Sequence, residues 1–209
     1  MRYRADDPAV LQDRAAAHPL YNAAGGRDQL RVFVGPPLRQ SFARFGVPPA
    51  SLDEAIARFR ARYVPIGKFE NTPYPGIAGL LDRLQGAGYR LFVATSKPQV
   101  TAQEVLEHFQ LARYFERVCG ASLDAGRETK EDVISYLLAQ IGDPGQVVMV
   151  GDTAFDVLGA KVHGIPTIGV TWGYGQVEAM REAGAAALAD TPEQLEALLH
   201  TPGVFSPAP

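Results

Sequence analysis

Two aspartates, Asp152 and Asp156, follow a segment that has the composition of a buried strand. Residues 147–150 are all apolar, which is typical of a strand covered on both faces in a parallel sheet. Four residues separate the two aspartates, so both can face the crevice beyond the strand if Asp156 lies on an opening helix. Two such carboxylates repel each other unless a hard cation or a basic group lies between them, so a Mg2+ site is a natural hypothesis. In the alternative, Asp152 caps the helix and Asp156 is solvated.

A second group of polar side chains comes earlier in the chain. Thr95 and Ser96 follow an apolar strand at 90–94 and precede a helix that begins with a proline. Their hydroxyls and the free amides of the helix could hold a phosphoryl group, or the hydroxyls could simply cap the helix. Lys130 begins a later helix and, taken alone, would be solvated. Taken in sequence order, the hydroxyls at 95–96 would bind phosphate, Lys130 would supply a positive charge, and the two aspartates would supply a pair of metal ligands.

The elements that position these residues alternate along the chain from Pro75 onward. Helical stripes and short β-rich runs follow one another, which predicts an α/β fold with a parallel sheet and helices on both faces. Strands are expected at 90–94, around Val118, at 147–150 and at 167–170. The helix after Lys130 has the most regular apolar stripe, at residues 133, 134, 137, 138 and 141.

The part of the chain before Pro75 has a different character. The spacing of apolar residues predicts a short helix that begins at Leu38 and is ended by Gly46. It predicts a second helix from Leu52 to Tyr63, with a capping-box signature at Ser51 and Glu54. Residues 67–75 form a connector. Residues 1–30 keep neither a helical nor a strand period.

Composition limits the class of protein. The 209 residues are 46% hydrophobic and 21% charged, which is typical of a globular domain. A net charge of −3 without a basic run indicates no nucleic-acid partner, and no segment approaches the length of a membrane span. The single cysteine, Cys119, is expected to be an inert buried thiol, so we expect a cytoplasmic protein. The sequence indicates no oligomeric state.

Three segments together resemble a known family. LFVATSKP, SLDAGRETKEDVI and VVMVGDTAFDVLGAKVHGIPTIGVTWGYG are similar to the second, third and fourth motifs of the haloacid dehalogenase (HAD) superfamily. FVGPPLRQSF and FENTPYPGI resemble the cap and cap junction of its phosphoglycolate phosphatase and 5′-nucleotidase-like members. The resemblance implies a Rossmann-like core at 1–20 and 74–209, with a small helical cap at 21–73. It also implies Mg2+-dependent hydrolysis of a small phosphorylated metabolite.

The resemblance also implies roles for individual residues. Thr95, with Ser96, would bind phosphoryl oxygens, and Lys130 would steady the nucleophile and the phosphate. Asp152 would bind Mg2+, and Asp156 would be a second ligand or a partner of the ligands. Two loops would lie near the site, one from Gly35 and Pro36 to Leu38 and the other from Trp172 to Gly175.

The amino terminus departs from the family pattern. Members begin with an apolar strand that ends in Asp-x-Asp-Gly-Thr, and this chain has no such segment. Asp6 is the only candidate nucleophile at the right place, but Asp7, Pro8, Ala9 and Val10 follow it. Asp13 falls where a later family acid would lie. Without the attacking carboxylate, several orders of magnitude in rate would be lost.

The missing strand has a structural consequence. It would lie between the strands that end at Thr95 and Gly151, and without it those strands face each other across a gap with unpaired backbone groups. Either the polar opening residues fill the gap badly, burying Arg2 or Arg4, or the fold is loosened. A shifted reading frame at the amino terminus would account for its composition. Two functions stay open: an impaired phosphatase, or an inactive relative that binds a phosphate compound or a partner protein. A flavodoxin-like receiver domain ranks last, because it has no place for the helical unit or the Thr95 turn.

Overall fold

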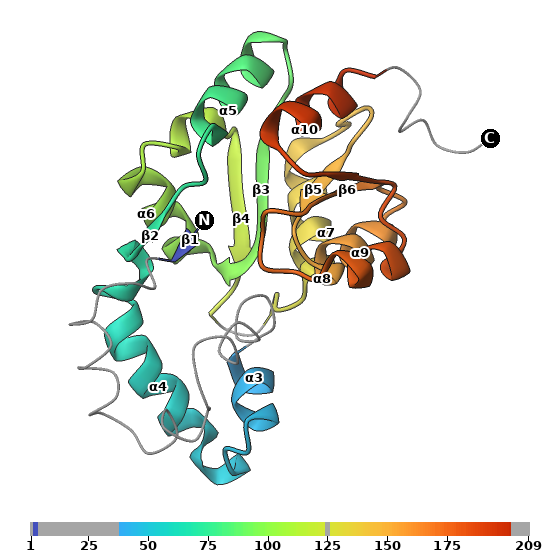
Figure 1. Cartoon of the computed structure of the whole chain (residues 1–209). Helices are drawn as coiled ribbons and strands as arrows, with labels where there is room; N and C mark the ends of the chain where they lie inside the picture. Colours follow the sequence, from blue (N-terminus) through green and yellow to red (C-terminus); the bar gives the residue numbers. More distant parts are fainter. Residues whose placement is uncertain (1, 4–37, 124–125, 202–209) are drawn as a thin grey trace. The chain divides into compact units, whose positions relative to one another are not determined.

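The computed structural model describes residues 2–3, 38–123 and 126–201, the first two of them by their backbone alone. The chain forms two compact units, residues 1–72 and 73–209 (Figure 1). The assignment of residues 1–20 to the core and 21–73 to a cap stays a prediction.

The first unit is helical where it is described. It contains strands β1 (Arg2–Tyr3) and β2 (Asn71–Thr72), which pair antiparallel, and helices α3 (Leu38–Arg44) and α4 (Leu52–Tyr63). Short 3-10 turns occur at Pro49–Ser51 and Gly67–Phe69.

Aromatic side chains join the two helices of this unit. The ring centroids of Phe42 in α3 and Phe59 in α4 are 6.3 Å apart, and Phe59 stacks on Tyr63 at 5.1 Å. The expected capping box at the start of α4 does not form, because the Ser51 side chain makes no capping hydrogen bond. Glu54 instead pairs with Arg58 one turn further along, at 2.6 Å.

The second unit has the alternating order predicted from the sequence. Its strands are β3 (Phe92–Pro98), β4 (Arg117–Ala121), β5 (Met149–Gly151), β6 (Thr167–Val170) and β7 (Ala187–Ala189). Its helices are α5 (Ile77–Gly86), α6 (Gln99–His108), α7 (Lys130–Ile141), α8 (Ala154–Lys161), α9 (Val177–Ala183) and α10 (Pro192–Leu199), with a 3-10 turn at Ala112–Tyr114.

All strand pairs of this unit are parallel, in two separate sheets. β3 pairs with β4, and β5, β6 and β7 form the second sheet in that order. The α/β fold with parallel strands is therefore confirmed. Among the described residues no strand joins β3 to β5, which is the interruption that the sequence led us to expect.

Helices cover both faces of the sheets. Leu91 and Val93 pack against α6 side chains, whereas Phe92 and Ala94 pack against α7. Because successive side chains of a strand point to opposite faces, α6 and α7 lie on opposite sides. The α7 layer continues through α8, which packs on β5 and β6.

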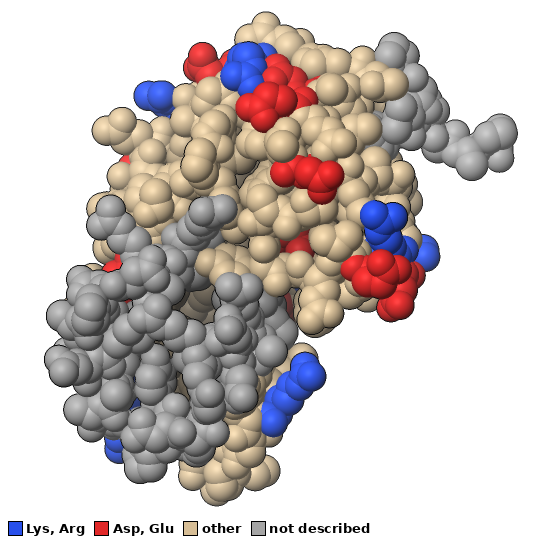
Figure 2. All heavy atoms as spheres, in the orientation of Figure 1, with Lys and Arg blue, Asp and Glu red and all other residues tan. Residues whose placement is uncertain are grey.

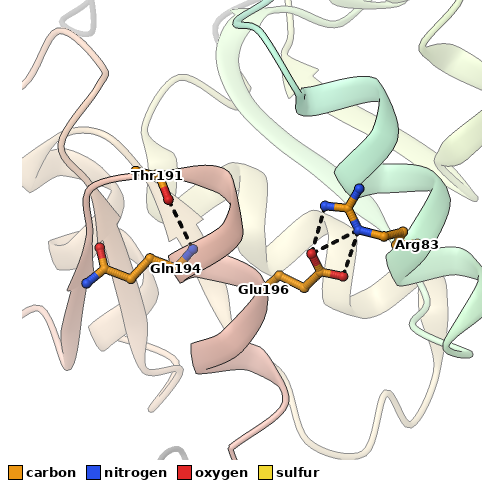
Figure 3. Close-up of polar contacts among 4 residues, drawn as sticks. All are labelled: Arg83, Thr191, Gln194 and Glu196. Carbon is orange, nitrogen blue, oxygen red and sulfur yellow. Dashed lines mark hydrogen bonds and ion pairs between the residues drawn. The ribbon is translucent and has the colours of Figure 1, made fainter.

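The last helix closes the other face of the second sheet. The main core cluster there joins buried residues of α5, β6, β7 and α10, namely Leu80, Leu84, Ile168, Val170, Ala189 and Leu195. Figure 3 shows two contacts that fix α10. Thr191 Oγ1 accepts the Gln194 N–H at 3.2 Å, and Arg83 of α5 forms an ion pair with Glu196 at 2.7 Å.

The described surface has an ordinary mixture of charges. On the face drawn in Figure 2, basic and acidic side chains occur in small, scattered groups, some of which lie next to each other. The chain contains exposed ion pairs, among them Arg90 with Glu116 at 2.9 Å. No helix in the described ranges is long and apolar enough to cross a membrane. Cys119 is buried in β4, and burial raises the pKa of its thiol, which agrees with an unreactive cysteine.

Candidate active site

Lys130 is the residue that connects the two sheets. It is the first residue of α7, after the N-cap Thr129. Its Nζ donates to the Ala94 carbonyl of β3 at 2.8 Å and lies 2.9 Å from Oδ1 of Asp156 in α8. The Lys130 side chain is only 12% exposed, so the sequence-based alternative of a solvated lysine is wrong.

Asp156 is held from both of its oxygens. Oδ1 faces Lys130, and Oδ2 accepts the Thr153 N–H at 3.0 Å and the Thr153 hydroxyl at 2.8 Å. The two residues form the capping box of α8, with Thr153 as the N-cap. The alternative that Asp152 caps the helix is wrong, because Thr153 is the N-cap. The alternative that Asp156 is solvated is also wrong, because Asp156 is buried.

Asp152 lies between the end of β5 and the start of α8, where a loop closes on it. Its Oδ2 accepts the Tyr174 N–H at 2.8 Å. A Cβ on Gly173 would overlap the Asp152 side chain, and one on Gly175 would overlap the Asp152 carbonyl oxygen. Only glycine permits this close approach, because it has no Cβ. The other carboxylate oxygen of Asp152, Oδ1, makes no hydrogen bond or ion pair with any described residue.

Thr95 and Ser96 lie within β3 rather than after it. Regular pairing with β4 ends at Thr95 opposite Gly120, and the register then shifts before Pro98. The Thr95 hydroxyl accepts the Lys97 N–H at 3.2 Å, which fixes the turn and leaves its own proton available for donation. Thr95 follows directly on Ala94, the residue whose carbonyl holds Lys130.

The structure thus brings together most of the residues singled out from the sequence. Lys130 and Asp156 touch, Thr95 and Ser96 lie at the end of β3 beside Lys130, and Asp152 lies four residues before Asp156. Trp172 is a member of the same loop as Tyr174, but it packs against the core cluster around Ile168. The candidate nucleophile Asp6 and the loop residues Gly35 and Pro36 lie outside the described residues.

Two residues of the site were not found from the sequence, Thr153 and Gly159. Thr153 supports Asp156, and Gly159 makes room for Lys130, whose Cγ would lie 2.6 Å from a Cβ there. The pattern Thr-x-x-Asp at 153–156 is a capping-box signal that identifies Thr153, whereas no local signal identifies Gly159. Tyr174, whose amide holds Asp152, lies in the loop at 172–175 that was expected near the site, but its contact was not predicted.

The oxygen atoms of the site fit a hard cation such as Mg2+. Mg2+ in proteins is commonly held by one or two carboxylates, with water and substrate phosphate completing its shell. Asp152 supplies one carboxylate oxygen, Oδ1, that makes no hydrogen bond or ion pair with a described residue, and buried Asp156 adds negative charge four residues further on. The described residues contain no group of three or more acidic, His or Cys side chains that could hold a metal.

A parallel α/β core with polar side chains at the carboxyl ends of its strands defines a Rossmann-like protein with a ligand site at that edge. Residues 13–170 match the family model described as haloacid dehalogenase-like hydrolase. The chain belongs to this family.

Curated relatives carry several names. Over 146 residues the chain is 44% identical to the tyrosine-protein kinase PtkA of Mycobacterium tuberculosis, which covers 69% of this chain and 50% of the kinase. The chain thus spans about half the length of that relative. It is 40% identical over 155 residues to a 5′-nucleotidase of Pseudomonas aeruginosa, covering 73% and 70% of the two chains. It is 34% identical over 192 residues to a phosphoglycolate phosphatase of Rhodospirillum rubrum, covering 88% and 75%.

Solved structures agree with the fold. A predicted phosphatase from Clostridium acetobutylicum superimposes with a TM-score of 0.77 at 40% identity, over 81% of this chain and 80% of that one.

Proposed function

We propose that this chain binds Mg2+ and small phosphomonoesters at the site around Lys130, and that it is a phosphatase of the phosphoglycolate phosphatase-like type whose turnover is impaired. The observation that carries the proposal is the position of the Lys130 ammonium, between the Ala94 carbonyl and the Asp156 carboxylate. Three segments that are far apart in sequence meet there. Relatives named phosphoglycolate phosphatase and 5′-nucleotidase support the substrate class.

Each residue has a role that follows from its chemistry. The Thr95 hydroxyl and the Ser96 hydroxyl would donate to phosphoryl oxygens, and Lys130 would neutralise part of their charge. Asp152 would hold Mg2+ through its free oxygen, and the bound ion would supply further positive charge to the phosphate. Asp156, with both oxygens held, would orient Lys130 rather than bind the metal.

Impaired turnover follows from the absence of an Asp-x-Asp-Gly-Thr segment. The site has groups to bind and polarise a phosphomonoester, but the one carboxylate among the described residues that pairs with Lys130, Asp156, already has both oxygens engaged. Losing a covalent nucleophile lowers the rate by several orders of magnitude, while the binding groups retain part of the catalysis.

The test is the release of phosphate from p-nitrophenyl phosphate and phosphoglycolate, with and without Mg2+. We expect slow, Mg2+-dependent release that Asp152→Asn abolishes. Asp190→Asn is the matched control, because Asp190 accepts a hydrogen bond from Thr171 outside the site. Release that is independent of Mg2+, or unchanged in Asp152→Asn, would contradict the proposal.

The second candidate is an inactive relative that binds a phosphate compound. It is favoured by the interruption between β3 and β5, where a strand that could carry a nucleophile is missing among the described residues. Calorimetric binding of phosphoglycolate in the presence of Mg2+, lost in Lys130→Met and without any turnover, would establish this candidate and exclude the phosphatase.

A further inference from the structure

In the part of the chain that the structure describes, strands β3 and β5 each have an edge without a partner strand. Among the described residues β3 pairs only with β4, and β5 pairs, on one side alone, with β6 (Figure 1). An unpaired edge in the middle of a protein leaves backbone donors and acceptors without partners.

Backbone hydrogen bonds show which groups of β5 lie on its open edge. The Met149 N–H donates at 2.9 Å to the carbonyl of Pro166, the residue that precedes β6. Because the backbone groups of successive residues in a strand point to opposite edges, the N–H and C=O of Val150 point away from β6. Val150 therefore offers one donor and one acceptor to the open edge.

The same reasoning applies to β3. The Leu91 carbonyl accepts the Glu116 N–H at 2.9 Å and so faces β4. Phe92 and Ala94 alternate with the residues that face β4, so their backbone groups point to the other edge. Lys130 Nζ confirms this direction, because it reaches the Ala94 carbonyl at 2.8 Å from outside the β3–β4 pair.

The two open edges face each other and run in the same direction. Lys130 joins the Ala94 carbonyl near the end of β3 to Asp156, and Asp156 lies against Gly151 at the end of β5. The carboxyl ends of both strands therefore lie on the same side, close to one lysine side chain. A strand placed between them would run parallel to both.

Burial shows that the space between the edges is open to solvent. β6, which has a partner on each side, is buried at all four of its residues. By contrast, every residue of β3 is partly exposed, and Val150 in the centre of β5 is 40% exposed. An apolar side chain in the middle of a parallel sheet is normally covered.

The amino-acid sequence at 4–37 contains no long apolar run. The centre of a parallel sheet requires a continuous apolar run of about four residues or more. Among residues 4–37 no such run exceeds three residues, as at 9–11, 15–17 and 32–34.

We propose that the open edges of β3 and β5 form an acceptor site for one extended, apolar strand of a partner polypeptide, which inserts parallel to both. The partner strand pairs with the backbone of Phe92, Ala94 and Val150 and covers the Val150 side chain. This is strand addition on two edges at once, so backbone pairing supplies affinity and an apolar sequence supplies specificity.

The experiment adds a synthetic peptide, Lys-Lys-Val-Ile-Val-Val, to the full chain and follows amide hydrogen exchange by NMR. At a peptide concentration of ten times its Kd, exchange at Ala94 and Val150 is expected to slow about tenfold. The amides of Val93 and Gly151 face β4 and β6 and should change little. The same peptide with a proline replacing isoleucine is the control, because it lacks a central donor and is expected to give no protection.

Variants of the acceptor edges separate strand pairing from nonspecific apolar binding. Val150→Pro removes the N–H on the open edge and leaves the Met149 bond to Pro166 in place, so it should weaken peptide binding at least about tenfold. Ala94→Pro makes the same change in β3 and serves if the first variant does not fold.

Three results would overturn the proposal. Ala94 and Val150 amides could already be as protected as Val93 and Gly151 in the free chain. The peptide could fail to protect them, or the proline peptide could protect them equally. Protection that rises with protein concentration alone, together with a dimer in sedimentation, would assign the site to a second copy of this chain instead.

Discussion

At the level of single residues, Lys130 matters both for the stability of the fold and for the proposed binding of phosphate. Its partner Asp156 is 6% exposed, so removing the ammonium would leave a buried carboxylate that keeps only the Thr153 donors. Breaking a buried ion pair from one side costs about 3 kcal/mol.

We therefore expect Lys130→Met to lower the free energy of unfolding by about 3 kcal/mol, measured by urea denaturation. The double variant Lys130→Met/Asp156→Asn should recover part of this loss, because the unpaired charge is gone. Lys161→Met, at an exposed position at the end of α8, is the control and should change stability by less than about 0.5 kcal/mol. A loss no larger than that of the control would refute the buried pairing.

Two helical glycines offer a matched test of the space around Lys130. A Cβ at Gly159 would lie 2.6 Å from the Lys130 Cγ, whereas a Cβ at Gly86 meets nothing within 4 Å. Gly86→Ala should stabilise the protein by about 0.5 kcal/mol through helix propensity. Gly159→Ala should destabilise it instead and weaken phosphate binding, since Lys130 must move.

Thermal unfolding and phosphate titration of both glycine variants provide the measurement. If Gly159→Ala stabilises the protein as much as Gly86→Ala and phosphate binding is unchanged, the position of the Lys130 side chain does not require a glycine at 159.

At the level of elements, α7 brings Lys130 into place, and its first turn is fixed by a reciprocal cap. Thr129 Oγ1 accepts the Asp132 N–H at 3.1 Å, and Asp132 Oδ2 accepts the Thr129 N–H at 3.0 Å. The backbone hydrogen bond from Thr129 is the main reason that the pKa of Asp132 lies below its usual value of 3.8. The ionised form is therefore favoured in the folded chain.

A lowered pKa in the folded state gives stability that is complete above the unfolded pKa and is lost as pH falls through the folded one. Asp132→Asn should therefore cost about 0.5 kcal/mol at neutral pH. The cost should shrink as the pH falls below the usual pKa and disappear below the lowered pKa of the folded chain, where both proteins carry a neutral side chain. Urea titrations of both proteins from neutral to acidic pH check this, and a difference that persists in acid would mean that the charge does not act through the cap.

The sequence predicted the long, regular elements well and the short ones poorly. The stripe after Lys130 is α7, and the apolar run before Asp152 contains β5. By contrast β7 (Ala187–Ala189) and α9 (Val177–Ala183) were missed, because alanine-rich segments of three and seven residues show no periodicity. Ser51 had a capping signature that the folded chain does not use, since the 3-10 turn before α4 satisfies the start of the helix differently.

The sequence allowed the residues of the site to be predicted, but not the contacts that they make with one another. Order along the chain placed Thr95, Lys130 and Asp152 at strand and helix ends, and parallel strands bring such ends to one edge. The contacts of Lys130 with a backbone carbonyl and with Asp156 depend on the packing of α7 against α8, which no local pattern encodes.

At the level of the whole molecule, the strands that the structure describes in the second unit form two parallel sheets held together by helices. α7 packs on β3 and β4 and against α8, while α8 packs on β5 and β6. In this arrangement the ion pair of Lys130 and Asp156 lies at the seam, which is the boundary between the β3–β4 sheet with α7 and the β5–β6–β7 sheet with α8. Stability at this seam is expected to be lower than in the core around β6.

Amide hydrogen exchange of the chain alone tests that expectation, with neighbouring residues as internal controls. Val150 and Gly151 are adjacent in β5, but only the Val150 N–H points away from β6, so it should exchange at least about tenfold faster than its neighbour. Ala94 and Val93 form the same kind of pair in β3. Alternation of fast and slow amides along both strands would establish two open edges, because a strand with partners on both sides protects every amide. Uniform protection along β3 and β5 would mean that the two sheets are joined by a strand in solution, and the division of the core would then be wrong.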